Sequence, residues 1–147
     1  MWKLSCTAAI TLAPQIICAD LLFLFMHSPF RAVIAMLACS RIGAVHSVVF
    51  GGFAAKELAT RITDCQPKVI VSASAGVEPT RVVPYKPLLD KALELANHNV
   101  QSTIIVQRRD VEECELGPNE QDYDEFMASQ TNKAEPVPLP ANHPHHM

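Results

Sequence analysis

The sequence predicts an α/β fold with a partial, parallel three-stranded βαβαβ sheet. Three short runs rich in β-branched residues, 46–50, 68–73 and 102–107, read as strands, and a helical pattern lies in each interval between them. The run 68–73 is apolar without alternation, which is typical of a strand covered on both faces. Strands that alternate with helices are joined by right-handed crossovers and lie parallel.

The length and amino-acid composition predict a globular chain. It has 147 residues, of which 49% are hydrophobic and 18% charged, enough for one domain with a core. The net charge of −3 offers no basic patch, so we expect no nucleic-acid partner. Five cysteines at wide spacing, without C-x-x-C, predict neither a disulfide framework nor a metal site, and favour a reducing compartment.

Residues 1–30 are expected to be an atypical leader, unlike the rest of the chain. An uncharged run, 4–19, is interrupted by Pro14, and Asp20 separates it from the apolar run 21–26. A membrane helix needs about 20 continuous apolar residues, so we expect no membrane span. The leader is not Arg-rich, as a mitochondrial presequence would be. A partly buried or unstructured segment is favoured, with a signal peptide or anchor as the alternative.

Residues 32–39 are all apolar, and periodicity alone does not distinguish a buried helix from a buried strand. Good helix formers such as Met36 and Leu37 favour a helix, and Gly43 is placed to cap its end. A helix that is apolar on all sides is expected in the interior of something larger than this chain.

Two further helices are predicted, with a loop between them. The stripe in 54–64 ends at Pro67, and a second helix begins at Pro84 and ends near Asn97. The segment between the second strand and Pro84, residues 74–83, is expected to be a loop.

The last part of the chain predicts little regular structure. Residues 109–125 are acidic and read as a solvated loop, with a short helix at 123–130. We expect residues 31–130 to form the folded part and 131–147, rich in Pro and His, to be a disordered tail. The tail histidines could bind a stray metal ion, but their spacing fixes no geometry.

Two segments at strand ends are candidates for ligand binding. Ligands of open α/β sheets bind beyond the carboxyl ends of the strands, where the turn Phe50-Gly51-Gly52-Phe53 and the loop 76–81 lie. Glycines allow the backbone to approach a ligand, a helix N-terminus favours an anion, and Arg81 could pair with a phosphate. The alternative is that the glycines make a tight turn and that Arg81 is a solvated loop residue.

Known catalytic motifs are missing from these 147 residues. There is no G-x-G-x-x-G, no G-x-x-x-x-G-K-[ST] and no G-x-S-x-G, and no Cys or His lies in a nucleophile signature. We therefore predict no catalytic residue. From the residues alone, the chain is a small α/β domain that could bind an anionic ligand.

Four segments carry a resemblance to a known family: 35–53, 56–62, 67–74 and 76–81. They resemble acetyl-CoA synthetase and its short-chain acyl-CoA synthetase relatives, of the adenylate-forming (AMP-binding) superfamily. The likeness covers about residues 32 to 130. The Glu-Pro-x-Arg form of residues 78–81 looks more like the propionate-preferring, mitochondrial-type members than like the bacterial acetate enzyme.

The resemblance implies a two-step ligation, in which a carboxylate and ATP give an acyl-adenylate and CoA then displaces AMP. Magnesium and ATP serve the first step in this family. Carried over by position, Gly51, Gly52, Glu78 and Arg81 match the family's CoA site, and Glu78 stands where the bacterial type has an arginine. The resemblance implies no metal-binding residue in this chain.

The chain also departs from the family. The phosphate-binding loop expected soon after Pro144 and the lysine of the C-terminal domain are absent from these residues. We therefore expect an inactive chain that needs no cofactor of its own and binds CoA weakly at most. As an alternative, it is a non-catalytic interaction fragment that pairs with full-length synthetase or another protein through its open sheet edges and apolar helix. By family, its compartment is the mitochondrial matrix or the cytosol.

Overall fold

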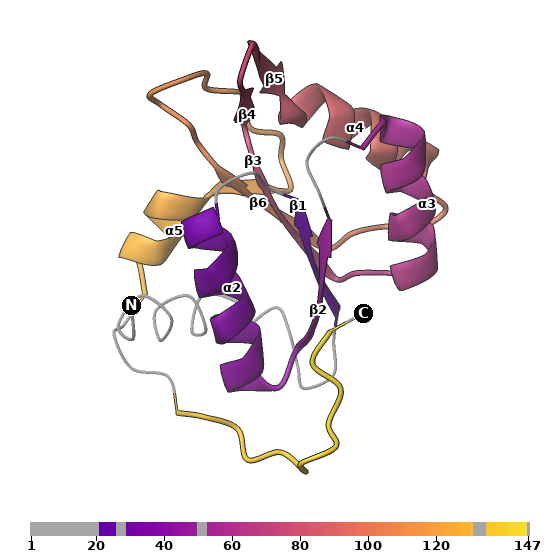
Figure 1. The fold of residues 1–147 in the computed structure, drawn as a ribbon, viewed down its shortest axis with the longest axis vertical. Helices are drawn as coiled ribbons and strands as arrows, with labels where there is room; N and C mark the ends of the chain where they lie inside the picture. Colours follow the sequence, from indigo (N-terminus) through magenta and orange to yellow (C-terminus); the bar gives the residue numbers. More distant parts are fainter. Residues whose placement is uncertain (1–20, 26–28, 50–52, 131–134, 147) are drawn as a thin grey trace.

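The computed structural model describes residues 21–25, 29–49, 53–130 and 135–146, and these form helices around a parallel sheet (Figure 1). All pairs in the sheet are parallel, which confirms the predicted α/β class. The strand order is β2-β1-β3-β6-β7, so the direction of winding reverses between β1 and β3. The strands are β1 (Leu21–Phe25), β2 (Val45–Val49), β3 (Val69–Ala73), β6 (Ser102–Val106) and β7 (Glu120–Asp122).

The sheet has two more strands than the predicted three. β1 comes from the segment expected to be a leader, and it lies between β2 and β3, with Leu22 opposite His46 on one side and Val69 on the other. A short apolar run fits a buried strand or a buried helix, and this one was assigned to the leader because its neighbours in the sheet are distant in sequence. β7 is short and polar, and backbone pairing of Gln121 with Ile104 places it.

Helices cover both faces of the sheet, giving three layers (Figure 1). α2 (Pro29–Ile42) and α5 (Tyr123–Ala128) lie on one face, and α3 (Ala55–Cys65) and α4 (Tyr85–Leu95) lie on the other. This distribution follows from right-handed crossovers that run first from β1 to β2 and then back towards β3 and β6. The two helices of the first face are joined by Arg31, which lies 3.3 Å from Asp124 and over the ring of Tyr123.

α2 ends where the sequence predicts. Gly43 has a φ of 73°, in the left-handed region, and the N–H of Ala44 donates to the carbonyl of Cys39 at 3.0 Å. This pattern is the Schellman motif, which glycine permits at little cost. The inner side of α2 is buried, whereas an outer stripe of large apolar side chains stays exposed: Phe30, Val33 and Leu37.

α3 and α4 pack against each other and the sheet through the predicted apolar stripes. α3 buries Leu58, Ala59 and Ile62 and ends at Gln66, whose φ is 49°. α4 starts after Pro84, which supplies the extended residue before the helix, and buries Tyr85, Leu89 and Ala92.

The segment between β3 and α4 is not the irregular loop that the sequence predicts. It forms an antiparallel hairpin of β4 (Ala75–Glu78) and β5 (Arg81–Pro84), turning at Pro79-Thr80. The base of the hairpin lies against α4, where Gly76 meets the ring of Tyr85. A β-carbon at position 76 would overlap the Tyr85 ring, so this contact requires glycine.

Ser74 holds the carboxyl ends of β3 and β6 together. Its buried hydroxyl donates to the carbonyl of Glu112 at 2.6 Å and accepts from the N–H of Arg108 at 2.8 Å. Its own N–H donates to the carbonyl of Val106, and its carbonyl accepts from the N–H of Tyr85. The start of the hairpin is therefore fixed to the loop that follows β6.

The end of the chain lies along α2 and β2. The N–H of Val137 donates to the carbonyl of Arg41, and the N–H of His46 donates to the carbonyl of His145, each at 3.0 Å. His146 forms an isolated parallel bridge with His46. The sequence prediction of a disordered tail made no allowance for these contacts of residues 135–146.

Candidate functional site

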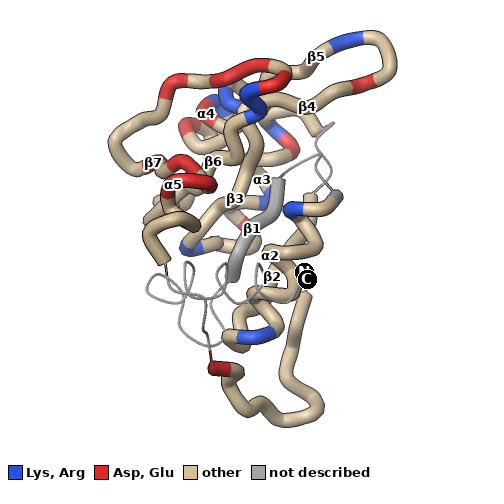
Figure 2. The backbone as a smooth tube through the Cα atoms, turned by 90° about the vertical axis from the view of Figure 1, so that its left-hand side faces the viewer, with Lys and Arg blue, Asp and Glu red and all other residues tan. Residues whose placement is uncertain are grey.

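The β4–β5 hairpin carries two of the predicted site residues. Glu78 and Arg81 are opposite each other across the turn, and the Nε of Arg81 donates to Oε2 of Glu78 at 2.8 Å. The side chain of Arg81 is 68% exposed and that of Glu78 is 32% exposed. The hydrogen bond to Glu78 raises the pKa of Arg81, so its guanidinium stays charged. Figure 2 shows the two opposite charges near the tip of this projecting hairpin.

A hollow of about 330 Å³ lies beside this ion pair. Phe53 and Ala54 line it from the segment that follows β2, and Val83, Pro84 and Leu88 line it from the hairpin and α4. Both Glu78 and Arg81 also line it. Because β2 and β3 are parallel, the segments that follow them meet at the carboxyl edge of the sheet, where open α/β folds bind ligands.

The start of α3 supplies a second feature that suits an anion. Ala54 is the residue before the helix, and no side chain caps the first turn. The first backbone N–H groups of a helix are without partners inside it and favour negative charge. The hollow thus combines an apolar wall, one arginine and a helix N-terminus.

Phe53 is itself held by a cation. The guanidinium of Arg61, on the second turn of α3, lies 4.9 Å from the centre of the Phe53 ring. An arginine over an aromatic ring at this distance is an attractive cation–π contact. Arg61 therefore orients one wall of the hollow.

The predicted pair of glycines, Gly51 and Gly52, lies outside the described residues. Glu78 and Arg81 are brought together, with Phe53 and Ala54 lining the same hollow, which joins the two segments that the sequence nominated. The sequence reasoning included Phe53, as the end of the candidate turn 50–53, but missed Arg61 and its contact with the Phe53 ring. Their spacing of eight residues gave no signal for this contact, because it is not a repeat of the helix and Phe53 precedes α3.

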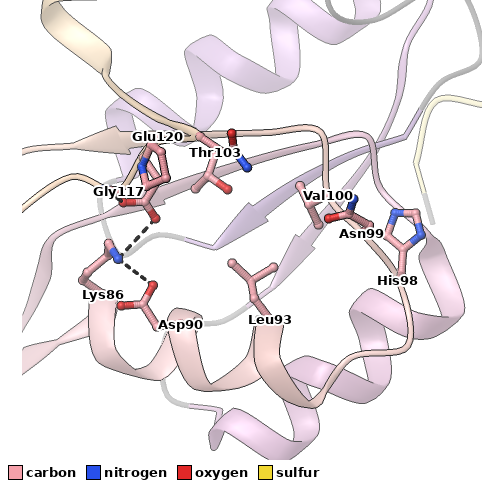
Figure 3. Close-up of a pocket in the computed structure, with 11 residues that line it drawn as sticks. Lys86, Asp90, Leu93, His98, Asn99, Val100, Thr103, Gly117 and Glu120 are labelled. Carbon is pink, nitrogen blue, oxygen red and sulfur yellow. Dashed lines mark hydrogen bonds and ion pairs between the residues drawn. The ribbon is translucent and has the colours of Figure 1, made fainter.

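A second hollow, of about 290 Å³, lies between α4 and the starts of β6 and β7 (Figure 3). Lys86 points to Asp90 and to Glu120, which lies 3.2 Å away, and the opposite end is lined by His98 and Asn99. Burial alone would lower the pKa of Lys86, but its hydrogen bonds to Asp90 and Glu120 leave that pKa raised. The charges of this hollow already satisfy one another, so we assign it a structural role.

Acidic residues are frequent along the chain between β6 and α5 (Figure 2). Arg109 pairs with Glu113 at 3.3 Å and with the buried Asp122 at 3.4 Å. Asp122 also accepts from the backbone N–H groups of Asp124 and Glu125, which caps α5. These charges are occupied in local contacts and contribute no anion site.

Among the described residues, no group of three His, Cys, Asp or Glu side chains could hold a metal ion. Within the same part of the chain, no helix has the length and hydropathy to cross a membrane.

The fold and the hollow define a class of protein: a doubly wound α/β domain with its candidate ligand site at the carboxyl edge of the sheet. A family model described as AMP-binding enzyme matches residues 14–147. The chain belongs to this family of AMP-binding enzymes.

Individual relatives carry more specific names. The chain is 44% identical to the rat (Rattus norvegicus) protein named acyl-CoA synthetase short-chain family member 3, mitochondrial. The aligned stretch of 126 residues is 85% of this chain and 18% of the rat protein. Acyl-CoA synthetase short-chain family member B, mitochondrial, of Dictyostelium discoideum is 52% identical over 92 residues, 63% of this chain and 13% of that protein.

A bacterial relative is named for acetate. The acetyl-coenzyme A synthetase of Thiobacillus denitrificans is 39% identical over 125 residues, 85% of this chain and 19% of that protein. The chain thus spans less than a quarter of the length of each of these relatives. The residues matched by the family model, 14–147, include the stretch 32 to 130 that carries the resemblance.

Proposed function

We propose that this chain carries part of the CoA site of a short-chain acyl-CoA synthetase. In the whole enzyme, a short-chain carboxylate and ATP give an acyl-adenylate and pyrophosphate, with magnesium, and the thiol of CoA then displaces AMP to form the thioester. The names of the relatives support this class of reaction. They also support the mitochondrial matrix as a compartment, with the cytosol as the alternative.

The observation that carries the proposal is the hollow between Phe53 and the Glu78–Arg81 pair. The 3′-phospho-ADP end of CoA offers a flat base and several phosphates. The apolar wall of Phe53, Val83 and Leu88 suits the base, while Arg81 at the rim suits a phosphate. Glycines at positions 51 and 52 would let the preceding backbone approach the same ligand.

Binding is expected to be weak. Glu78 already holds the Nε of Arg81 and adds a negative charge beside the phosphate position. Arg81 is largely exposed, so water and salt screen its attraction for a phosphate. The terminal nitrogens of Arg81 remain to receive the ligand.

We further propose that the 147-residue chain forms no thioester by itself. Adenylate chemistry depends on groups that position the phosphates and stabilise developing charge. In the described part of the chain, the carboxyl-edge hollow contains one arginine and one carboxylate that are paired with each other, and no further charged side chain lines it.

Titration calorimetry with CoA and with CoA that lacks the 3′-phosphate tests the binding proposal. We expect CoA to bind more tightly than the dephosphorylated form and Arg81→Ala to abolish that difference. Arg109→Ala is the matched control, because Arg109 is a comparably exposed, carboxylate-paired arginine away from the hollow. Equal CoA affinity for Arg81→Ala and the native chain would remove Arg81 from the site.

Activity is tested separately. Purified chain incubated with propionate, ATP, magnesium and CoA should give no acyl-CoA above the blank by mass spectrometry. Turnover that depends on the protein concentration would refute the proposed inactivity while leaving the family unchanged.

The second candidate function is pairing with full-length synthetase. The exposed stripe of Phe30, Val33 and Leu37 on α2, together with Val48 on the edge strand β2, is the observation that favours it. Large exposed apolar side chains that are contiguous mark interaction surfaces. Capture of full-length synthetase by the native chain, and its loss in Val33→Glu/Leu37→Glu, would support pairing; capture by both forms would not.

A further inference from the structure

The outer edge of β2 faces away from the sheet and is met by the end of the chain. β2 is the first strand in the order of the sheet, and its inner side pairs with β1. On the outer side, the N–H of His46 donates to the carbonyl of His145 at 3.0 Å, and His146 forms a parallel bridge with His46. An edge strand presents unpaired backbone groups to which another extended segment can bind.

The contact also brings histidine side chains together. The ring centres of His46 and His146 are 6.3 Å apart, and those of His143 and His145 are 6.0 Å apart. The Nε2 of His143 lies 3.0 Å from the carbonyl oxygen of Gly43, at the end of α2. Two pairs of imidazoles therefore lie where the tail crosses β2 and the end of α2.

His46 differs from the three tail histidines because it is buried. It is 5% exposed, and its Nδ1 has no hydrogen-bond partner within the described part of the chain. An added proton at Nδ1 would place an unpaired donor and a positive charge in this buried position.

We propose that the outer edge of β2 is a strand-accepting surface occupied by residues 143–146 of the same chain, and that protonation of His46 releases them. The occupant is the chain's own tail, because its backbone is already seated there by one hydrogen bond and one bridge. Releasing the tail lets water reach the His46 ring, so that the charge is solvated and moves away from the other imidazoles.

The charges around His46 support this direction. Burial lowers the pKa of His46 from its ordinary value of 6.5, and His146 and His145 lower it further. Both of these neighbours are histidines of the tail. No charged residue of α2, which packs against β2, contributes to the lowered pKa of His46. Leu22, the residue opposite His46 on β1, is uncharged. No carboxylate among the described residues offsets the repulsion.

The pH dependence of tail docking follows from the linkage between docking and proton binding at His46. A histidine whose pKa is lower with the tail docked than with it released binds more protons in the released form. Docking is therefore stable above the ordinary histidine pKa of 6.5 and weakens as the pH falls from there towards the lowered value.

Amide hydrogen exchange of the full chain measures docking, because the His46 N–H is protected only while His145 accepts from it. We expect the protection factor of this N–H to fall by about tenfold or more between about pH 7.5 and about pH 5. The N–H of Ser74, which donates to Val106 far from the tail, reports whether the sheet stays folded and should keep its protection.

Two variants separate the proposal from general acid unfolding. His46→Phe cannot be protonated, so the amide at position 46 should keep its protection at the lower pH. His98→Gln, the matched control, alters a histidine that contacts Pro67 and not the tail, and should behave as the native chain. Unchanged protection in the native chain, or an equal fall in His46→Phe, would overturn the proposal.

A reciprocal measurement covers the case in which His46→Phe does not fold. If protonation weakens docking, docking must lower the His46 pKa by the same factor. A chain ending at Pro140 should therefore show a higher His46 midpoint in an imidazole NMR titration than the full chain. An equal or lower midpoint in the shortened chain would overturn the proposal.

Discussion

The ring of Tyr85 lies directly against Gly76, leaving no room for a β-carbon on the hairpin. Tyr85 is the first residue of α4 and is almost fully buried, so it is fixed by the core beneath it. The contact sets how β4 leaves the sheet, and thereby where the tip with Glu78 and Arg81 stands.

Gly76→Ala is therefore expected to destabilise the chain. The methyl group would overlap the Tyr85 ring and force either the hairpin or the start of α4 to move, at a cost of about 1–3 kcal/mol in the free energy of unfolding. Urea denaturation measures the change. Gly117→Ala is the control, because its added carbon would meet only the flexible side chain of Glu120 at 3.4 Å. Equal stability of the two variants would contradict the packing argument.

Lys86→Met is expected to lower the free energy of unfolding by about 1–3 kcal/mol, because it removes the cation that Glu120 faces in a largely buried position. Glu120 would keep only its hydrogen bond from the N–H of Gly117. Lys91→Met is the control: its pair with Glu94 is exposed, and its loss should cost less than about 0.5 kcal/mol. Thermal unfolding of both variants in the same buffer measures the two losses of stability. A larger loss of stability in Lys91→Met than in Lys86→Met would contradict the argument from burial.

Glu78→Gln is expected to strengthen CoA binding by roughly threefold, because it removes the negative charge that competes for Arg81. The gain should shrink at high salt, since both side chains are partly or largely exposed. Calorimetry at two ionic strengths measures it. Weaker binding by Glu78→Gln would mean that Glu78 orients Arg81 for the ligand and does not compete with it.

Cys39 is expected to resist alkylation in the folded chain. It is fully buried on α2, so the reagent cannot reach the sulfur. Burial also raises the pKa of its thiol to about 12, so the reactive thiolate is scarcely populated at neutral pH. Among the cysteines of the described residues, Cys65 and Cys114 are partly exposed and should react with iodoacetamide before Cys39. Peptide mass spectrometry with and without urea identifies the modified residues; rapid labelling of Cys39 without urea would show that α2 opens.

The helices and three of the strands were predicted because each is marked by residues close together in the sequence. Leu58 and Ile62 repeat on one side of α3, and Gly43 marks the end of α2. The missed elements depend on distant partners. β1 is an apolar run whose neighbours in the sheet start at Val45 and Val69, and β7 is polar and is placed by pairing with β6. The hairpin was missed because Gly76 and Pro79 read as loop residues.

The sequence nominated the two segments of the candidate site but not how their side chains lie against each other. The sequence left Arg81 as either a phosphate partner or a solvated loop residue, and it did not predict the ion pair with Glu78, which the strand pairing of the hairpin brings opposite. Recognising that pair from sequence requires knowing that residues 75–84 form a hairpin. The aromatic wall of Phe53 and its arginine likewise follow from how α3 begins.

The position of β1 has a consequence for any shorter product of this gene. Translation that began at Met26 would leave out Leu21–Phe25, the strand between β2 and β3. Those two strands would then stand roughly 10 Å apart, twice the usual spacing, with facing rows of unpaired amides and carbonyls. Such a product would have to bring β2 and β3 together in a new register or take an extended segment from another molecule to pair their backbone groups.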